Sequence, residues 1–472
     1  MKGETARETN THQKALRVNL DQAKHGTFAE IGAGQEVARW FFHVGGAAGT
    51  VAKTISAYDM AVSDSLYGRC DRYVSRERLE AILSQEYDLL LQQLTGRRPS
   101  GTTFFVFADT MATRSFTRHQ EGHGWMGVRF QHTVDAPPSE IILHVRMHDT
   151  DNAREQEAIG VLGVNLLYGA WYHSGELEVL ISSLMDELTR DRIEIDLIRF
   201  SGPCFHEVDN RLMILQLVVQ DFTGAVMFTA SGEVVQPAEV LYNRPVVVER
   251  GSFRPVTNLT MDMIQRAKAL FDDTSTGGNV KPVVVMEMTL KNLLEGDTLD
   301  HADFLARADM LGALGHNVII TSYGPYFQIA KCLRSYTNAR IVFAMGVPGL
   351  RELLDPKYYT DLPGGILEGF GQLFCGEVKL CIYPSRDPAI GNLLTMHEVE
   401  VEPRIRHLYQ HLLMNRMMVA IENVDEGELH IFPSDVLNKI QSGDQSWEQM
   451  VPRPAVEIIK VRGLFGYPSG TR

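Results

Sequence analysis

The chain has 472 residues, of which 44% are hydrophobic and 22% are charged. These fractions are ordinary for globular proteins and exclude collagen-like, coiled-coil and extensively disordered classes. Acidic residues exceed basic residues by 59 − 45 = 14, and this negative balance repels phosphate backbones, which argues against nucleic acid as the main partner.

The cysteine pattern and the apolar stretches favour a cytoplasmic protein that does not enter a membrane. The five cysteines form no CxxC pair and are odd in number, so the sequence predicts neither a disulfide framework nor a thiolate zinc site. The longest apolar stretch, at 158–172, is shorter than the roughly twenty residues of a membrane span, and we interpret it as a buried helix. The polar start lacks the apolar core of a signal peptide.

The first part of the chain predicts a loose arm at 1–20 and an α/β domain at 21–238. Residues 76–95 place apolar side chains three and four apart, which is typical of an amphipathic helix, and 102–110 has strand character. Further strands are predicted at 139–149, 193–200, 212–220 and 225–235, and further helices at 151–169 and 176–190.

Two glycine-rich segments lie near the start of this domain. One has Gly32 and Gly34 ahead of a helix, like the turn of a Rossmann unit, but lacks the third glycine. The other, at 44–54, contains Lys53 without the adjacent Gly-Lys-Thr of a phosphate loop. We interpret both as tight packing. The alternative is that the segment from Gly45 to Lys53 approaches a phosphate or a neighbouring subunit.

A histidine-rich segment at 118–132 supplies residue types that ligate metals or exchange protons. Its glycines, Gly122 and Gly124, predict a loop, and its spacing differs from that of a zinc-binding helix. We interpret these histidines as structural or surface residues, with a metal site as the alternative, and assign no metal ligand. The residues concerned are His119, Glu121, His123 and His132.

The second part of the chain predicts a Rossmann-like domain at 239–400 and a C-terminal helix with a Pro-rich tail at 401–472. Continuous apolar strands alternate with helices, which favours a parallel sheet buried on both faces. The C-terminal helix is expected over 402–424. Strands are predicted at 246–250, 282–288, 316–322, 339–346 and 378–385, and helices at 261–271, 301–315 and 325–336.

The segment GSFRPVTNLTMDMI, at 251–264, follows the first of these strands and is the main candidate site. Gly251 permits close backbone approach, and Thr257 lies where a helix begins, so free N–H groups and the helix dipole are expected to hold an anion. Arg250 and Arg254 add positive charge. The alternative is a strand-to-helix turn inside an α/β core.

This segment resembles the first signature of nucleotidyltransferases such as phosphopantetheine and nicotinate-nucleotide adenylyltransferases, G-x-F-x-P-x-[TH]-x-G-H after the first strand. Leu259 and Thr260 stand in place of the final Gly-His pair. The resemblance implies a nucleotide pocket and, in an active enzyme, nucleotidyl transfer, in which that histidine stabilises charge on the phosphates. Four positions match the signature: Gly251, Phe253, Pro255 and Thr257.

The resemblance also places a lysine after the second strand, where this chain has Lys291. It implies a nucleotide or phosphate ligand, with Mg²⁺ as an accompanying ion, and leaves open whether the chain is an enzyme. The competing hypothesis is a non-catalytic scaffold that forms a homo-oligomer or filament. The catalytic candidates are Thr257, Thr260 and Lys291, and the ligand-binding candidates are Arg250, Gly251, Ser252, Phe253, Arg254, Tyr323, Gly324 and Gly346.

Overall fold

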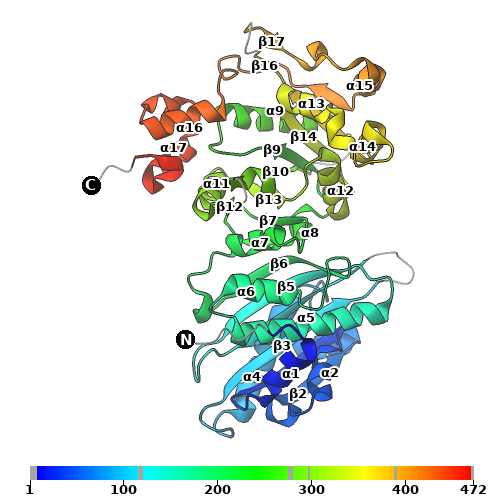
Figure 1. Ribbon diagram of the computed structural model, residues 1–472, viewed down its shortest axis with the longest axis vertical. Helices are drawn as coiled ribbons and strands as arrows, with labels where there is room; N and C mark the ends of the chain where they lie inside the picture. The colour runs from blue at the N-terminus through cyan, green and yellow to red at the C-terminus, as the bar shows by residue number, and fades with distance from the viewer. Residues whose placement is uncertain (1–7, 115–120, 275–279, 296–297, 387–390, 469–472) are drawn as a thin grey trace. The chain divides into compact units, whose positions relative to one another are not determined.

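The computed structural model describes residues 8–114, 121–274, 280–295, 298–386 and 391–468. The chain divides into two compact units, Met1–Thr223 and Gly224–Arg472, and each combines helices with a sheet (Figure 1). The predicted α/β class is therefore confirmed. The division comes earlier than the expected border at 238, because the segment after Thr223 pairs with the second sheet.

The N-terminal unit is built on a six-stranded sheet in the order β2-β1-β3-β4-β5-β6. The strands β2, β1 and β3 are parallel, and the remaining three extend the sheet in antiparallel fashion. The chain leaves β1 toward β2 and then returns to β3 on the other side of β1. The strands are β1 (Lys24–Gly32), β2 (Val51–Ala57), β3 (Thr103–Ala112), β4 (Gly122–Phe130), β5 (Ser139–Met147) and β6 (Ile193–Ser201).

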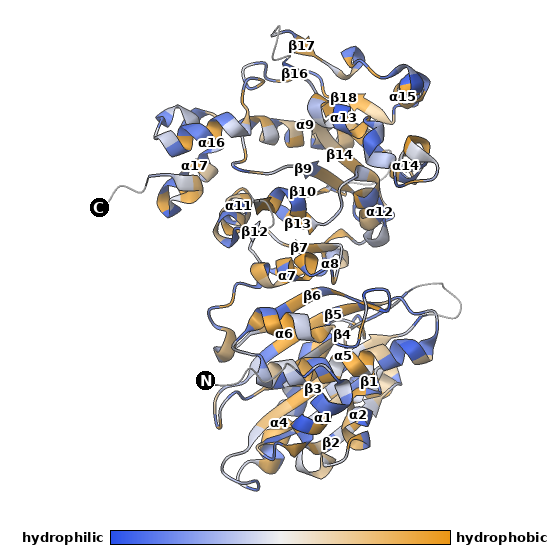
Figure 2. Cartoon of the chain, in the orientation of Figure 1, coloured by the Kyte–Doolittle hydropathy of each residue, from blue (hydrophilic) through white to orange (hydrophobic). Residues whose placement is uncertain are grey.

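Helices cover this sheet because successive strand residues point apolar side chains to opposite faces. Ala29 and Val106 pack with α4 on one face, whereas Phe28 packs against Phe41 of α2 and Phe107 on the other. Figure 2 shows the hydrophobic strands within each unit. The helices are α1 (Thr11–Leu20), α2 (Val37–His43), α3 (Met60–Tyr67), α4 (Arg76–Leu94), α5 (Asn152–Tyr172), α6 (Leu177–Leu184) and α7 (Asn210–Val219).

The expectation of a loose arm is wrong for residues 11–20, which form α1. Asn10 caps this helix by accepting a hydrogen bond from the N–H of Gln13. The fully buried Lys14 places its Nζ 2.6 Å from Asp186 Oδ2 and 2.8 Å from Asn165 Oδ1. These partners compensate the buried charge and fix the helix to the unit.

Two other predictions in this unit are wrong. Residues 212–219 lie in α7 and not in a strand, because Asp209 caps a helix there, and a short apolar run does not distinguish the two structures. The histidine-rich segment forms β4 and not a loop from Gly122 onward, since its glycines let β3 and β5 pair closely on either side. His119 lies outside the described residues.

The C-terminal unit is built on an eight-stranded sheet in the order β18-β15-β14-β9-β10-β13-β7-β8. The six strands from β18 to β13 are parallel. When these strands are numbered by their order along the chain, their order across the sheet is 6-5-4-1-2-3, which is the doubly wound arrangement of dinucleotide-binding folds. The strands are β7 (Ala225–Phe228), β8 (Val234–Val235), β9 (Val246–Arg250), β10 (Val283–Thr289), β13 (Asn317–Thr321), β14 (Ile341–Gly346), β15 (Val378–Tyr383) and β18 (Met418–Ala420). Short two-stranded pairs complete the unit: β11 (Leu294–Glu295) with β12 (Thr298–Leu299), and β16 (Ser385–Arg386) with β17 (Leu393–Leu394).

Both faces of this sheet are covered, as the apolar strands predict. Val247 and Val342 pack with α9 on one face, and Val248 and Phe343 pack with α12, α13 and α14 on the other. The helices are α8 (Pro237–Leu241), α9 (Asn258–Thr274), α10 (Leu290–Leu293), α11 (His301–Ala313), α12 (Tyr326–Tyr336), α13 (Val347–Leu353), α14 (Gly365–Leu373), α15 (Arg406–Met414), α16 (Pro433–Ser442) and α17 (Arg453–Arg462).

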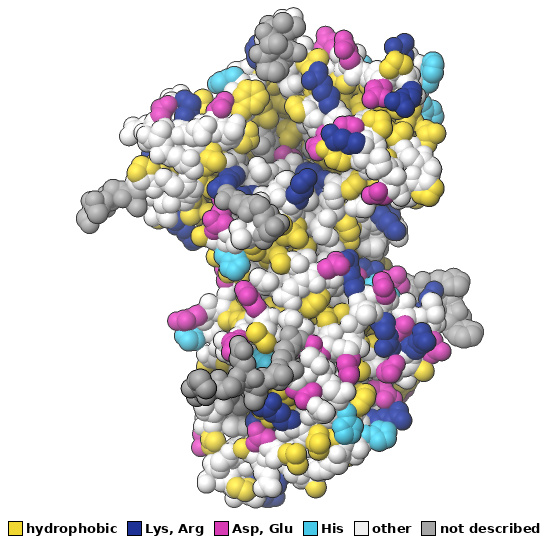
Figure 3. Space-filling model, viewed as in Figure 1, with side chains coloured by type: hydrophobic (Ala, Val, Ile, Leu, Met, Phe, Trp, Pro, Cys, Tyr) yellow, Lys and Arg dark blue, Asp and Glu magenta, His cyan; other side chains and the backbone are white. Residues whose placement is uncertain are grey.

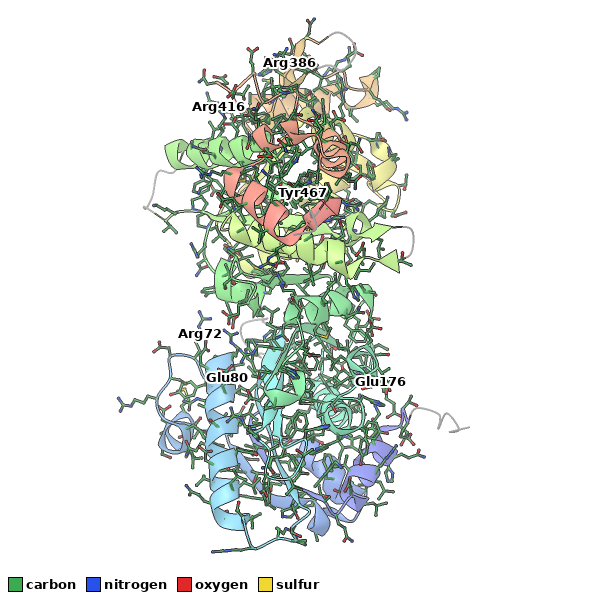
Figure 4. The ribbon with its side chains drawn as sticks, turned by 90° about the vertical axis from the view of Figure 1, so that its left-hand side faces the viewer. Arg72, Glu80, Glu176, Arg386, Arg416 and Tyr467 are labelled. Atoms are coloured by element: carbon green, nitrogen blue, oxygen red, sulfur yellow. The ribbon has the colours of Figure 1, made fainter. Side chains whose placement is uncertain are left out.

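The long C-terminal helix expected over 402–424 is wrong beyond Met414. The chain turns through Arg416, labelled in Figure 4, whose φ is +51°, and then adds β18 to the sheet edge. The following helices α16 and α17 carry a small core in which Trp447 packs against Tyr467, their rings 6.0 Å apart. In the described part of the chain, no helix is both long and apolar enough to cross a membrane.

Candidate functional site

The carboxyl ends of β9 and β14 form the point where the strand order of the C-terminal sheet reverses. From β9 the chain moves to β10 and β13 on one side, and then returns to β14 on the other. Open parallel sheets bind ligands in the crevice at such a point. The last paired residues here are Glu249 and Ala344, and two residues further on each chain reaches a glycine, Gly251 and Gly346.

The backbone at these two glycines differs in how closely other side chains approach it. A Cβ added at Gly346 would meet only Pro348 within 4 Å, at 3.4 Å, and the backbone there is extended, with φ −79° and ψ 167°. At Gly251 the ring of Phe253 already lies on the side where a Cβ would point. Phe253 is buried with φ +49°, so Gly346 has the less covered backbone of the two glycines.

Glu249 is a buried carboxyl group at the carboxyl end of β9. It is 5% exposed, and its Oε2 has no hydrogen-bond partner. Burial, together with the nearby charge of Glu287, raises the pKa of Glu249 to about 8. Glu249 is therefore mostly protonated at neutral pH, so it does not repel an anion and has an O–H to donate.

Arg250, predicted to bind phosphate, is held within the protein. Its Nε donates to Oε2 of the fully buried Glu287 at 2.6 Å, and its Nη2 donates to the carbonyl of Tyr323 at 2.6 Å. Its Nη1 donates to the carbonyl of Gly324, and its guanidinium stacks 5.0 Å from the ring centre of Tyr326. Arg250 thus ties β9 to β10 and to the loop before α12.

The loop between β9 and α9 is fixed by ionic contacts to α11. The Nε of Arg254 lies 2.7 Å from Asp303 Oδ1. Arg307 forms an ion pair with the same carboxylate, and its Nη1 donates to the carbonyl of Ser252 at 3.1 Å. The predicted ligand groups Ser252 and Arg254 therefore sit in an anchored loop, in which the Ser252 side chain remains exposed.

The start of α9, predicted to hold an anion, is covered by the C-terminal segment. Thr257 is 1% exposed and Thr260 is 8% exposed. The N–H of Asn258 donates to the carbonyl of Met450 at 2.9 Å, and its side-chain amide donates to the carbonyl of Gln449. The N–H of Thr260 lies 3.4 Å from Thr257 Oγ1. An anion at this helix start would have to displace the segment around Met450.

Lys291 lies on the same carboxyl edge, in α10 directly after β10. Its side chain is exposed and, among the described residues, has no ion-pair partner. Tyr323 and Gly324 also lie on this edge, after β13, and contribute the carbonyls that hold Arg250. Figure 3 shows this unit hollowed on the face toward the viewer, with basic and acidic side chains around the hollow.

Sequence reasoning missed Glu249 and Glu287. Each is a carboxyl group at the end of an apolar strand, in VVVER and VVVMEM. A charged residue inside such a run is a detectable signal, because strands buried on both faces are otherwise nearly all apolar. In the described ranges no three His, Cys, Asp or Glu side chains are placed to hold a metal ion.

The chain was compared with known proteins. No family model and no curated protein matches it. Among solved structures, a competence/damage-inducible protein from Agrobacterium tumefaciens is similar at 15% identity, over 34% of this chain and 94% of that one, with a TM-score of 0.25. A nicotinic acid mononucleotide adenylyltransferase from Plasmodium falciparum is similar at 11% identity, over 48% of this chain and 98% of that one, with a TM-score of 0.29. Scores this low carry no functional argument.

Proposed function

We propose that the C-terminal unit binds a small phosphate-bearing molecule, in the first instance a nucleotide, at the switch point between β9 and β14. The observation that carries this proposal is the uncovered backbone at Gly346, beside the central strand of a doubly wound sheet. Backbone that is free of a Cβ lets phosphate oxygens approach N–H groups closely.

The electrostatics support an anionic ligand of limited charge. Protonation of Glu249 removes one negative charge from the crevice at neutral pH, and Glu287 is compensated by Arg250. Lys291 supplies a cation at the same edge. Phosphate binding would then depend on backbone N–H groups and Lys291, and Arg250 would act as a structural residue.

Nucleotidyl transfer is the finer form of the proposal, with Thr257, Thr260 and Lys291 as its catalytic candidates. Mg²⁺ would neutralise the phosphates. Because the described residues form no metal cluster of their own, this ion would enter with the nucleotide. Thr257 and Thr260 are buried at the start of α9, so the first experiment measures binding and not catalysis.

Thermal unfolding of the full chain tests binding. ATP, CTP and NAD, each with and without Mg²⁺, are compared with adenosine, which lacks phosphate. A ligand at about 100 times its Kd adds roughly 2.7 kcal/mol to the free energy of unfolding, so we expect nucleotides to raise Tm and adenosine to raise it less. An unchanged Tm with every nucleotide would contradict the proposal.

A further inference from the structure

The N-terminal unit contains a cavity of about 270 Å³ at the carboxyl ends of β1, β2 and β3. It is bounded by Ile31 and Gly32 from β1, Ala57 from β2, and Thr110 from β3. Its volume is close to the lower end, about 300 Å³, of small-molecule sites. The cavity belongs to a different unit from the site proposed above.

The topology of this sheet also points to a ligand. Among the three parallel strands, β1 lies between β2 and β3. The chain passes from β1 to β2 through α2 on one face of the sheet, and from β2 back across β1 to β3 through α4 on the other face, so the connections diverge on either side of β1. Such a divergence is the second kind of switch point at which doubly wound sheets bind ligands. The cavity therefore lies where the fold places a site.

The charges around the cavity disfavour a phosphate. Among the described residues that line it, Asp59 is the one acidic residue, and none is Lys, Arg or His. The Asp59 carboxylate also caps α3, because the N–H of Val62 donates to its Oδ1 at 3.1 Å. The start of this helix is therefore served by an internal carboxylate, which repels a second anion.

The remaining walls suit a cation with an apolar body. The ring of Tyr58 is 79% exposed beside Asp59, and aromatic faces attract ammonium groups. Tyr73 is held in place, since its O–H donates to Asp64 at 3.0 Å and its carbonyl accepts from Thr110 Oγ1 at 2.6 Å. Apolar lining groups include Ile31, Val74, Met60 and Met111.

One polar side chain of the wall is left without a partner. Ser63 lines the cavity and is 3% exposed, and its Oγ makes no hydrogen bond in the described structure. A buried hydroxyl without a partner carries a desolvation cost that a ligand group can remove. We infer that this cavity binds a small organic amine, whose ammonium contacts Asp59 and Tyr58 and whose apolar body fills the space toward β1 and β3.

The test uses three probes that share one body and differ in charge: 2-phenylethylamine, 2-phenylethanol and phenylacetate. Binding to the full chain is measured by ligand-observed NMR at millimolar concentration. We expect the amine to bind about tenfold more tightly than phenylacetate, with the alcohol between them. Equal binding of all three, tighter binding of phenylacetate, or no binding of any probe would overturn the inference.

Two variants locate the interaction. Asp59→Asn keeps a side chain that caps helices equally well while removing the charge, so the preference for the amine is expected to fall about tenfold with Tm unchanged. Tyr58→Ala, at an exposed position, is expected to weaken the amine several-fold. Asp88→Asn on the exposed side of α4 is the matched control. An amine preference that survives Asp59→Asn contradicts the site.

Discussion

The two units end their central strands in opposite ways. In the C-terminal unit β9 ends in Glu249 and Arg250, and the arginine is neutralised by the buried Glu287. In the N-terminal unit, Glu30 of β1 and Asp109 of β3 are paired neighbours. Burial raises the pKa of Glu30 to about 7, and burial together with Glu30 raises that of Asp109.

For the two proposed sites, we infer from this difference that topology fixes the place of a site and side chains fix its ligand. Both sheets have a switch point at a carboxyl edge. The C-terminal edge has an uncovered Gly346 and an exposed Lys291, which suit phosphate. The N-terminal edge has Asp59 and Tyr58 around a cavity, which suit an amine.

The largest expected effect on stability is that of replacing Arg250, and it distinguishes a structural role of this residue from a role in ligand binding. Arg250→Leu leaves the fully buried Glu287 without its cation, so we expect a loss of about 3–5 kcal/mol in the free energy of unfolding, measured by urea denaturation. Lys357→Ala, which removes an exposed ion pair with Asp355, is the control and should change little. If the Arg250→Leu variant is as stable as the wild type but no longer binds nucleotide, Arg250 contacts the ligand and is not a structural residue.

The second prediction concerns the protonation of Glu249. Its pKa is about 8 in the folded chain and near 4.5 when exposed, so between these values the folded state binds a proton that the unfolded state has lost. Stability therefore falls as pH rises through this window and levels off above it. The Glu249→Gln variant should lack this component. The difference between its free energy of unfolding and that of the wild type should therefore increase by up to about 1.4 kcal/mol per pH unit from pH 5 to 8.

Urea denaturation of both chains across this pH range measures the difference. Other buried acids such as Glu30 have the same sign of effect, but they are present in both chains and cancel. A difference between the chains that does not change with pH would show that Glu249 is ionised throughout.

A smaller effect is expected from Gly34→Ala, at the end of β1. The added Cβ would lie 2.4 Å from both carboxyl oxygens of Asp109, so the carboxyl must shift. We expect a loss of about 1–3 kcal/mol by chemical denaturation. Gly175→Ala, where a Cβ meets nothing within 4 Å, is the control. Equal stability of both variants would show that Asp109 is free to move.

The smallest effect on stability is expected from Lys291→Ala. The side chain is exposed, so the free energy of unfolding should change by less than about 0.5 kcal/mol. The affinity of the Lys291→Ala variant for nucleotide should nevertheless fall about tenfold, as measured by isothermal titration calorimetry. An unchanged affinity would remove Lys291 from the phosphate site.

Much of the fold was predictable because its strongest signals are local. The apolar strand at 246–250 and the helix at 76–95 lie where periodicity placed them. Residues 212–220 were misassigned because Asp209, outside the apolar run, decides the helix. The strand β18 was missed because it depends on pairing with β15, a contact that no local pattern encodes.

For the candidate residues, the sequence predicts which strands they follow but not which groups they contact. The glycines at 251 and 346 were identified from the strands they follow. The ion pair of Arg250 with Glu287 and the cover of Met450 over α9 join residues 37 and about 190 positions apart, so no local motif reveals them. A motif thus identifies the residues near a ligand, and long-range contacts decide which of them are free.

Calorimetric titration of ATP with Mg²⁺ into the Gly346→Val variant tests the central claim most directly. A Cβ at Gly346 would meet only Pro348 within 4 Å, at 3.4 Å, so we expect the variant to fold while its valine covers the backbone at the end of β14. We expect saturable one-site binding to the wild type and to the control Gly101→Val, where a Cβ meets nothing within 4 Å, and at least tenfold weaker binding to Gly346→Val. Equal affinity of all three chains would contradict a nucleotide site between β9 and β14.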